Sequence, residues 1–374
     1  MKKSRALWAG VAALGLVLAT PTMASAGQKP KPAPDPVVKS SQVVAPFNLD
    51  LAGKRVYVAD GFANIVGTLS ADGSIAPTVN PAPGASGVEL SRDGKTLAFT
   101  TTEGEMEITA SGLNLWGPRG SKVYADTLAY ETAKNPDRKI AYGVANPSQC
   151  VSDALTAAGF PVSYTGLIDS HAYSVTQWGR KWVVADAGSN ALFAVDSRGR
   201  VSTLAVLPAQ PTTITAAMAG ALGMPECVVG VTYRFEAVPT DVEVGHDGML
   251  YVTTLPGGPE SPVLGARGAL WRVSPWTGKA TQIASGFLGA TNLAIGQRGE
   301  IYVAEYFAST ISVVKNGKTS HYLDLTNVVA LEAGHGGSLW AGTTISLDPT
   351  APQVPGTIVE ITGGKWHKKA SFRH

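Results

Sequence analysis

A short unit recurs six times along the chain, and this repetition limits the possible folds more than any other feature. Each copy has a short alternating stretch, a turn that contains Gly and a hydrophobic strand. The clearest copies are PTDVEVGHDGMLYVTT (239–254) and ATNLAIGQRGEIYVAE (290–305). Looser copies occupy residues 45–60, 85–101, 170–186 and 328–343.

The residues after each copy predict two further strands. In STISVVKNGKTSHYLDL (309–325), for example, polar and apolar residues alternate on both sides of a Gly-bearing turn. Each unit is therefore a four-stranded meander. One meander cannot bury both of its faces, whereas six around an axis cover one another. We predict an all-β fold, a six-bladed β-propeller of four-stranded antiparallel blades over residues 43–374; a β-sandwich, the rival fold, does not explain six copies.

Residues 1–26 have the features of a signal peptide. Lys2, Lys3 and Arg5 precede an apolar run, and Ala24-Ser25-Ala26 suits signal peptidase. The alternative, a retained membrane anchor, is disfavoured because the apolar run is shorter than the roughly 20 residues that span a bilayer. We expect a secreted, extracellular protein that does not insert into the membrane after signal cleavage.

Residues 27–42 alternate Pro with polar groups, a composition that predicts an extended, solvated linker. Cleavage of the signal would remove three of the 30 Lys and Arg residues and leave all 28 Asp and Glu residues, so the mature chain is close to neutral. This charge balance argues against a nucleic-acid partner. We expect a monomer.

The extra residues of the chain fall at two kinds of connection. In an up-and-down meander, the connections from the second to the third strand and those between blades emerge on the same face. We call this the decorated face and the opposite one the plain face. Binding and catalytic residues often lie on loops carried by a rigid scaffold, whereas neutral drift would scatter insertions over both faces. The insertions are 102–120, 255–268, 343–356, about 143–168 and about 208–237.

Two Cys residues, Cys150 and Cys227, lie in successive insertions between blades. In an exported chain an isolated pair favours a disulfide over a metal or redox site, which would need closer spacing or a third ligand. The bond would pin both insertions over the decorated face.

The innermost strands carry acidic residues at matching positions. Aligned on their hydrophobic residues, four of the six have an acid in the middle, at Asp50, Glu89, Glu243 and Glu332. Side chains two residues apart face the same way along a strand, so a second layer should line the axial tunnel nearer the decorated face. Its predicted members are Asn48, Gly87, Ala172, Asp241, Asn292 and Ala330.

Carboxylate and Asn oxygens suit Ca²⁺ or another divalent cation on the axis, for which Asp241, Asn292, Glu243 and Glu89 are the candidate ligands. Crowded carboxylates would also suit general acid and base catalysis. A water-filled tunnel lined by solvated acids is the third interpretation. These three readings stay open at the level of sequence, and no catalytic residue is assigned.

Four other residues are candidates for a binding surface on the decorated face. His171 starts an inner strand there, although a surface His without a ligand has the same pattern. The segments 114–120 and 257–271 are predicted to bring Trp116, Arg119 and Arg267 to this face, where aromatic and Arg groups suit a partner or a glycan. Alternatively, Trp116 covers a blade edge and the Arg side chains are solvated.

Three stretches, 170–196, 238–273 and 286–314, resemble the ScyD/ScyE family. The phrases PTDVEV, TLPGGPE, LGARG and GATNLA carry the likeness, which runs from about residue 45 to 362. The resemblance implies an exported β-propeller and supplies no catalytic residues. That family takes its name from genes associated with scytonemin biosynthesis.

More distantly, the units are similar to NHL repeats and to gluconolactonase-type calcium propellers. The latter resemblance implies a divalent metal held on the axis by Glu, Asn and Asp. Asp241 and Asn292 fall at suitable positions, but the fuller motif around the family's Asn is missing.

Two functions follow from these observations. The first is a secreted propeller that binds a partner protein, a glycan or a small molecule across its decorated face. The alternative is a metal-dependent, lactonase-like hydrolase in which an axial metal and a neighbouring carboxylate activate water. Whether the protein is an enzyme is left undecided by the sequence.

Overall fold

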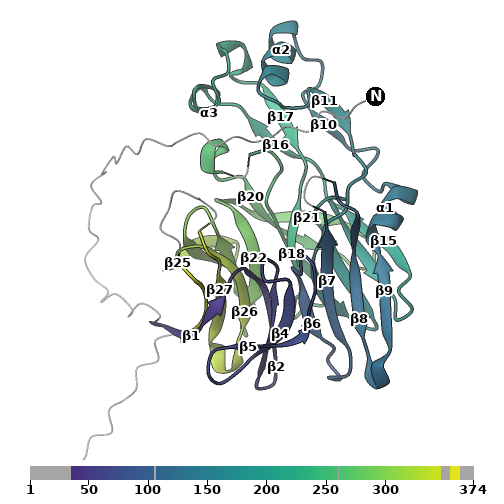
Figure 1. Ribbon diagram of the computed structural model, residues 1–374. Coiled ribbons are helices and arrows are strands. Elements are labelled where there is room, and N and C mark those ends of the chain that lie inside the picture. The colour runs from purple at the N-terminus through teal and green to yellow at the C-terminus, as the bar shows by residue number, and fades with distance from the viewer. Residues whose placement is uncertain (1–34, 105–106, 260, 347–353, 363–374) are drawn as a thin grey trace, which may run out of the picture.

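The computed structural model describes residues 35–104, 107–259, 261–346 and 354–362 (Figure 1). The predicted signal peptide, residues 1–26, lies outside them. The described chain is all-β and forms seven four-stranded antiparallel sheets. No helix in this part of the chain is long and apolar enough to cross a membrane.

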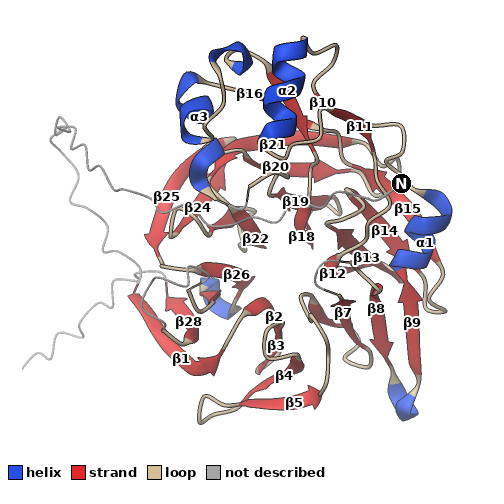
Figure 2. Cartoon of the chain, turned by 45° about the horizontal axis from the view of Figure 1, so that its top comes forward, coloured by secondary structure: helices blue, strands red, loops and turns tan. Residues whose placement is uncertain are grey.

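Six of the sheets, called the ring sheets, surround a common axis (Figure 2). Each begins with an inner strand, and neighbouring inner strands contact one another so that β2, β6, β12, β18, β22 and β26 close into a ring. In chain order the ring sheets are β2 (Pro46–Ala52), β3 (Arg55–Asp60), β4 (Ile65–Leu69), β5 (Ile75–Val79); β6 (Val88–Leu90), β7 (Leu97–Glu103), β8 (Ala110–Trp116), β9 (Lys122–Asp126); β12 (Ala172–Trp178), β13 (Lys181–Asp186), β14 (Ala191–Val195), β15 (Val201–Val206); β18 (Pro239–Val244), β19 (Leu250–Thr254), β20 (Gly268–Val273), β21 (Ala280–Phe287); β22 (Ala290–Ile295), β23 (Ile301–Glu305), β24 (Thr310–Lys315), β25 (Lys318–Asp324); and β26 (Val328–Ala333), β27 (Leu339–Thr343), β28 (Gly356–Thr362), β1 (Asp35–Val43).

A separate apolar cluster fills the space between every two neighbouring ring sheets. Between the third and fourth sheets, for example, Val183 and Leu192 pack with Val242 and Val252. Each fully buried Val or Leu contributes about 1.5–3 kcal/mol. The alternating apolar residues of the repeat therefore hold each sheet to the next.

The sixth ring sheet takes its outer strand from the start of the described chain. β1 pairs antiparallel with β28, so residues 35–42, which the Pro-rich composition predicted to be linker, are instead part of a strand. That prediction was wrong here because an edge strand tolerates both Pro36 and charged side chains. Lys39 reinforces the pairing, since its Nζ lies 2.8 Å from Glu360 and 5.6 Å from the centre of the Trp340 ring.

The seventh sheet is the cap, and the two long insertions between ring sheets build it together (Figures 1 and 2). Its strands lie in the order β11-β10-β17-β16, so that the first insertion pairs with the second. The predicted gathering of these two insertions on one face is confirmed. The elements of the cap are β10 (Ala141–Gly143), α2 (Gln149–Ala157), β11 (Ser163–Thr165), β16 (Gln210–Thr213), α3 (Ala216–Ala221), η2 (Glu226–Val228) and β17 (Thr232–Phe235). Two short helices, α1 (Thr127–Lys134) and η3 (Pro262–Leu264), lie beside the cap. The remaining turns, η1 (Pro118–Gly120) and η4 (His335–Gly337), belong to ring sheets.

Candidate functional site

The inner strands bring polar side chains to the axis in two layers, largely as the repeat predicts. The exception is the third strand, where Ser174 and Thr176 occupy the positions predicted for Ala172 and Ser174. The pairing of β12 with β13 shifts register between Ala172 and Ser174, as neighbouring inner strands do at matching points. Tyr173 lies at this irregularity, inside β12, and has no paired residue on β13. A slip of two residues keeps the same facing.

The layer nearer the decorated face ties neighbouring inner strands together. Its side chains accept hydrogen bonds from the backbone of the next strand, and such bonds to buried groups each contribute about 1 kcal/mol. The pairs are Val88 N to Asn48 Oδ1 (3.1 Å), Leu293 N to Asp241 Oδ2 (2.9 Å) and Leu331 N to Asn292 Oδ1 (2.7 Å). Ser174 Oγ donates to the other Asp241 oxygen, Oδ1.

The second layer makes similar contacts but is more acidic. Asp50 Oδ2 accepts from Leu90 N at 2.9 Å, and Glu89 Oε2 accepts from Gln177 N at 2.7 Å. The axial polar residues are therefore partly structural. Their hydrogen bonds, through Asn48, Glu89, Asp241 and Asn292, cross five of the six boundaries between ring sheets.

The axial carboxyl groups are electrostatically crowded. Burial raises the pKa of Asp50 to about 6. Burial, followed by the charge of Asp50, raises the pKa of Glu89 to about 8. Burial and then the opposing Glu332 raise the pKa of Glu243 well above its ordinary value, and the pKa of Glu332 shifts the same way through burial and Asp50. The pKa of Glu89 thus lies above neutral pH, so its carboxyl group retains a proton there.

Three of the four predicted metal ligands already accept hydrogen bonds from neighbouring strands. Asp241 uses both oxygens, and Asn292 and Glu89 each use one, in contacts with neighbouring strands. Among the described residues, no three His, Cys, Asp or Glu side chains are arranged to hold a metal ion. The axial cation stays a prediction.

Aromatic side chains gather where the axis meets the decorated face. We call Phe47, Phe62, His171 and Tyr173 the mouth cluster. Phe47 lies 5.4 Å from Phe62 and 6.0 Å from Tyr173 between ring centres, and Tyr173 lies 5.5 Å from His171. Phe62 is 50% exposed, whereas the other three are half-buried. The mouth cluster thus presents an aromatic surface directly beside the polar axial layer.

Arg267 lies on the decorated face, but as part of its framework. Its guanidinium is 4.4 Å from the centre of the Phe235 ring in the cap. It also donates to the carbonyl oxygens of Gly257 (3.0 Å) and Pro256 (3.3 Å). Burial lowers the pKa of Arg267 to about 10. This arrangement holds the connection between β19 and β20 against the cap.

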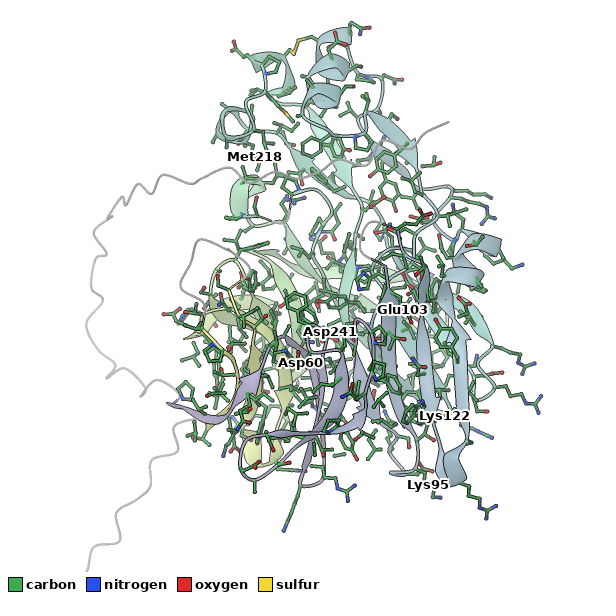
Figure 3. The ribbon with its side chains drawn as sticks, viewed as in Figure 1. Asp60, Lys95, Glu103, Lys122, Met218 and Asp241 are labelled. Carbon is green, nitrogen blue, oxygen red and sulfur yellow. A yellow bond between two sulfur atoms is a disulfide. The ribbon has the colours of Figure 1, made fainter. Side chains whose placement is uncertain are left out.

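Trp116 and Arg119 lie on the plain face, so their predicted placement was wrong. Residues 110–116 form strand β8, in which Trp116 pairs with Leu97 at the plain-face end, and Arg119 belongs to the tight turn that follows. The sequence predicted an insertion here, whereas the structure has a strand whose residues are mostly buried. Lys122, which lies 3.7 Å from the Trp116 ring centre, is at the opposite end from Met218 of the cap in Figure 3.

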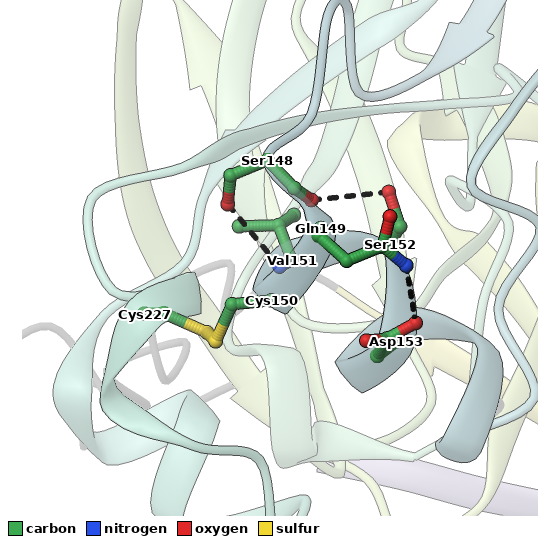
Figure 4. The surroundings of a disulfide bond; sticks show 7 residues. All are labelled: Ser148, Gln149, Cys150, Val151, Ser152, Asp153 and Cys227. Carbon is green, nitrogen blue, oxygen red and sulfur yellow. Dashed lines mark hydrogen bonds between the residues drawn. A yellow bond between two sulfur atoms is a disulfide. The ribbon is translucent and has the colours of Figure 1, made fainter.

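The predicted disulfide between Cys150 and Cys227 is confirmed (Figure 4). It joins α2 to η2, with 6.4 Å between the Cα atoms. Ser148 caps α2 by accepting a hydrogen bond from Val151 N. Beneath the disulfide, the cap has its own apolar core, with Leu155, Phe160, Val228, Tyr233 and Phe235 among its members. The cap is therefore a cross-linked unit on the scaffold.

An open pocket of about 470 Å³ lies beside the disulfide in the cap. It is lined by the start of α2 and by β17, and its one charged lining residue is Arg234, whose buried Nε has no hydrogen-bond partner. Repeat alignment could not reveal this pocket because both of its walls come from non-repeating insertions.

A group of acids between the cap and the third ring sheet was also missed. It includes Glu131, Asp137 and Glu236, whose pKa values are all raised, first by burial. These residues lie outside the repeat, so alignment of the units carries no information about them. The i, i+4 spacing of Glu131 and Asn135 was the one available signal.

Comparison with known proteins supports the fold. No protein-family model and no curated protein sequence matches the chain. The aldose sugar dehydrogenase of Streptomyces coelicolor, in its PQQ-bound form, is similar with a TM-score of 0.52 and 12% identity, covering 89% of this chain and 99% of that one. A streptogramin B lyase aligns with a TM-score of 0.48 and 16% identity, covering 88% and 97%. Because sequence identity is so low, the likeness to the aldose sugar dehydrogenase establishes the propeller fold alone.

Proposed function

We propose that the protein is a secreted binding protein whose ligand, a glycan or a polar small molecule, sits on the decorated face at the end of the axis. The observation that carries this proposal is the mouth cluster, where exposed Phe62 packs edge-on against Phe47 beside a carboxyl-rich axis. Ligand sites commonly combine aromatic walls with a few polar groups that fix orientation. Sugars offer apolar ring faces for the first and hydroxyl groups for the second.

The axial carboxyl groups add hydrogen-bonding groups next to this aromatic surface. The pKa of Asp50 is raised to about 6 and that of Glu89 to about 8. Near neutral pH the axis therefore offers both an ionised and a protonated carboxyl group. Such groups can donate to or accept from hydroxyl groups. The cap rises on the same face of the ring, and the disulfide and its own apolar core hold it together.

Binding to a glycan array, followed by calorimetry on the strongest ligand, tests the proposal. We expect Phe62→Ala to weaken binding at least tenfold. Trp276→Ala is the matched control, because Trp276 is 66% exposed in the turn between β20 and β21 on the plain face. An array without any bound glycan or sugar acid, or equal affinity for Phe62→Ala and wild type, would contradict the proposal.

The hydrolase alternative rests on the crowding of the axial acids. An axial divalent cation would relieve the repulsion that raises the pKa of Glu243. Its ligands would come from Glu243, Glu89, Asp241 and Asn292. The last three of these side chains accept hydrogen bonds from neighbouring strands. Lactone hydrolysis that requires a divalent metal and is lost in Glu243→Gln would favour this function.

Secretion is part of the proposal, and the disulfide supports it because such bonds persist in oxidising compartments. The resemblance to the ScyD/ScyE family points the same way, although membership of that family stays a prediction. Mass spectrometry of protein from the culture medium should find an N-terminus at Gly27. Retention of the uncleaved chain in the membrane fraction would refute secretion.

A further inference from the structure

A second group of carboxyl groups lies away from the axis, at the junction of α1, the cap and the third ring sheet. We call Glu131, Asn135 and Asp137 the off-axis cluster. Glu131 and Asp137 are fully buried, each with 0% exposure. None of the ion pairs formed among the described residues involves either acid.

The oxygens of this cluster lack partners. Both carboxyl oxygens of Glu131, the Oδ1 of Asn135 and the Oδ1 of Asp137 are buried without a hydrogen bond. Nearly all buried polar atoms in proteins are partnered, and an unmet one costs about 1–3 kcal/mol. Four unpartnered acceptors in one short segment indicate that a positively charged group belongs among them.

The local structure brings these side chains together. Asn135 caps the end of α1, where its N–H donates to Glu131 O at 2.7 Å, so the two residues lie one turn apart. Asn135 Nδ2 donates to Gly166 O at 3.0 Å. Asp137 Oδ1 also lies against Gly166, since a Cβ added there would overlap with it.

Neighbouring side chains donate hydrogen bonds to one oxygen of the Asp137 carboxylate and leave the other oxygen without a donor. Tyr142 Oη and Asn190 Nδ2 both donate to Asp137 Oδ2, at 2.9 and 3.0 Å. The hydroxyl oxygen of Ser189, beside Glu131, lies 3.0 Å from Asp186 Oδ1 and 3.1 Å from Asp169 O. These hydroxyl and amide groups therefore leave both oxygens of Glu131 and the Oδ1 of Asp137 without a hydrogen bond.

We propose that Glu131, Asn135 and Asp137 bind a hard cation of the Ca²⁺ type, which links α1 to the cap and the third ring sheet. Ca²⁺ accepts carboxylate, amide, carbonyl and water oxygens together, six to eight in all. The cluster supplies two carboxylates and one amide. It is therefore compatible with the finding that no three His, Cys, Asp or Glu side chains among the described residues are arranged to hold a metal ion. Burial and then the charge of Asp137 raise the pKa of Glu131 to about 8, as expected for an acid without its counterion.

Calcium titration of the chelator-treated mature protein tests this site. We expect one Ca²⁺ per chain by calorimetry and a higher thermal midpoint with Ca²⁺. Glu131→Gln should abolish both effects while folding normally, because the amide has the shape of the carboxyl group but cannot supply the negative charge that Ca²⁺ binding uses. Glu243→Gln is the control: it removes an axial carboxylate and should leave the binding intact.

Asn135→Gly is a second variant that keeps the left-handed backbone of the helix end (φ 38°) and removes only the amide oxygen. It should weaken Ca²⁺ binding about tenfold, the size of effect that loss of one polar contact of about 1.4 kcal/mol produces. Absence of Ca²⁺ and Mg²⁺ binding in the wild type, or unchanged binding in both variants, would overturn the proposal. Loss in Glu243→Gln alone would place the cation on the axis and equally overturn it.

Discussion

The carboxylate of Asp241 accepts a hydrogen bond from the backbone N–H of Leu293 at 2.9 Å, across the boundary between the fourth and fifth ring sheets. Its other oxygen accepts from Ser174 in the third sheet. One fully buried side chain thus connects three sheets. The polar residues that the sequence predicted as metal ligands therefore also hold neighbouring ring sheets together.

Asp241→Ala should therefore destabilise the fold by about 2–3 kcal/mol, because Leu293 N–H loses its partner in a buried setting and Ser174 loses its acceptor. Urea unfolding measures the change. Asp241→Asn keeps an acceptor oxygen and should cost less. Equal stability of the alanine variant and the wild type would show that the axial layer does not hold the ring.

Stability should fall as pH rises from about 4.5 to about 8. Folding raises the pKa of Glu89 from its ordinary 4.5 to about 8, so across this window the folded state retains a proton that the unfolded chain releases. Asp50, with its pKa raised to about 6, adds to the lower part of the window. Urea unfolding at pH 5, 6, 7 and 8 checks the slope.

Glu89→Gln should flatten that slope, since the amide does not titrate and can still accept from Gln177 N. Asp72→Asn is the control because Asp72 is exposed and its pKa is lowered by Ser74, which places its titration below the window. A wild-type stability that increases between pH 5 and 8 would show that the axial acids are ionised in the folded protein.

The propeller fold could be predicted because the repeat encodes it locally. Each unit has the alternation that buries residues such as Val242 and Leu293 between sheets, and each has a Gly turn that sets the hairpin. The cap sheet was not predictable in this way. Its strands β10 and β17 come from different insertions and are only three and four residues long, so neither carries a clear period.

The candidate site was predicted in part, and the errors have local causes. Asp241 and Asn292 lie where the hydrophobic alignment placed them, whereas a backbone irregularity shifted the third strand. Trp116 was misplaced because a Gly-Pro pair just after it obscured the end of β8. Glu131 and Asp137 belong to no repeat, and only tertiary structure reveals that they are buried together.

Removal of the disulfide should loosen the cap and leave the ring sheets intact. The bond closes a separation of 77 residues, which corresponds to about 4.5 kcal/mol in the chain-entropy model. In a Cys150→Ser, Cys227→Ser double variant, hydrogen exchange should increase in α2 and α3 but not in β18 and β19. Exchange that increases equally in both regions would mean that the cap and the ring unfold as one unit.

Arg267→Ala should free the connection between β19 and β20 from the cap, because no other side chain both stacks on Phe235 and donates to Gly257 O and Pro256 O in the described structure. Limited proteolysis should then cut within residues 255–267 at a rate at least several-fold higher than in the wild type. Arg267→Lys should restore little protection, since an ammonium lacks the planar fork that reaches two carbonyl oxygens while stacking on a ring. Arg119→Ala, at an exposed turn on the plain face, should leave cleavage unchanged. If Arg267→Lys were as resistant as the wild type, positive charge alone would hold the segment, and the stacking on Phe235 would contribute nothing to the order of the decorated face.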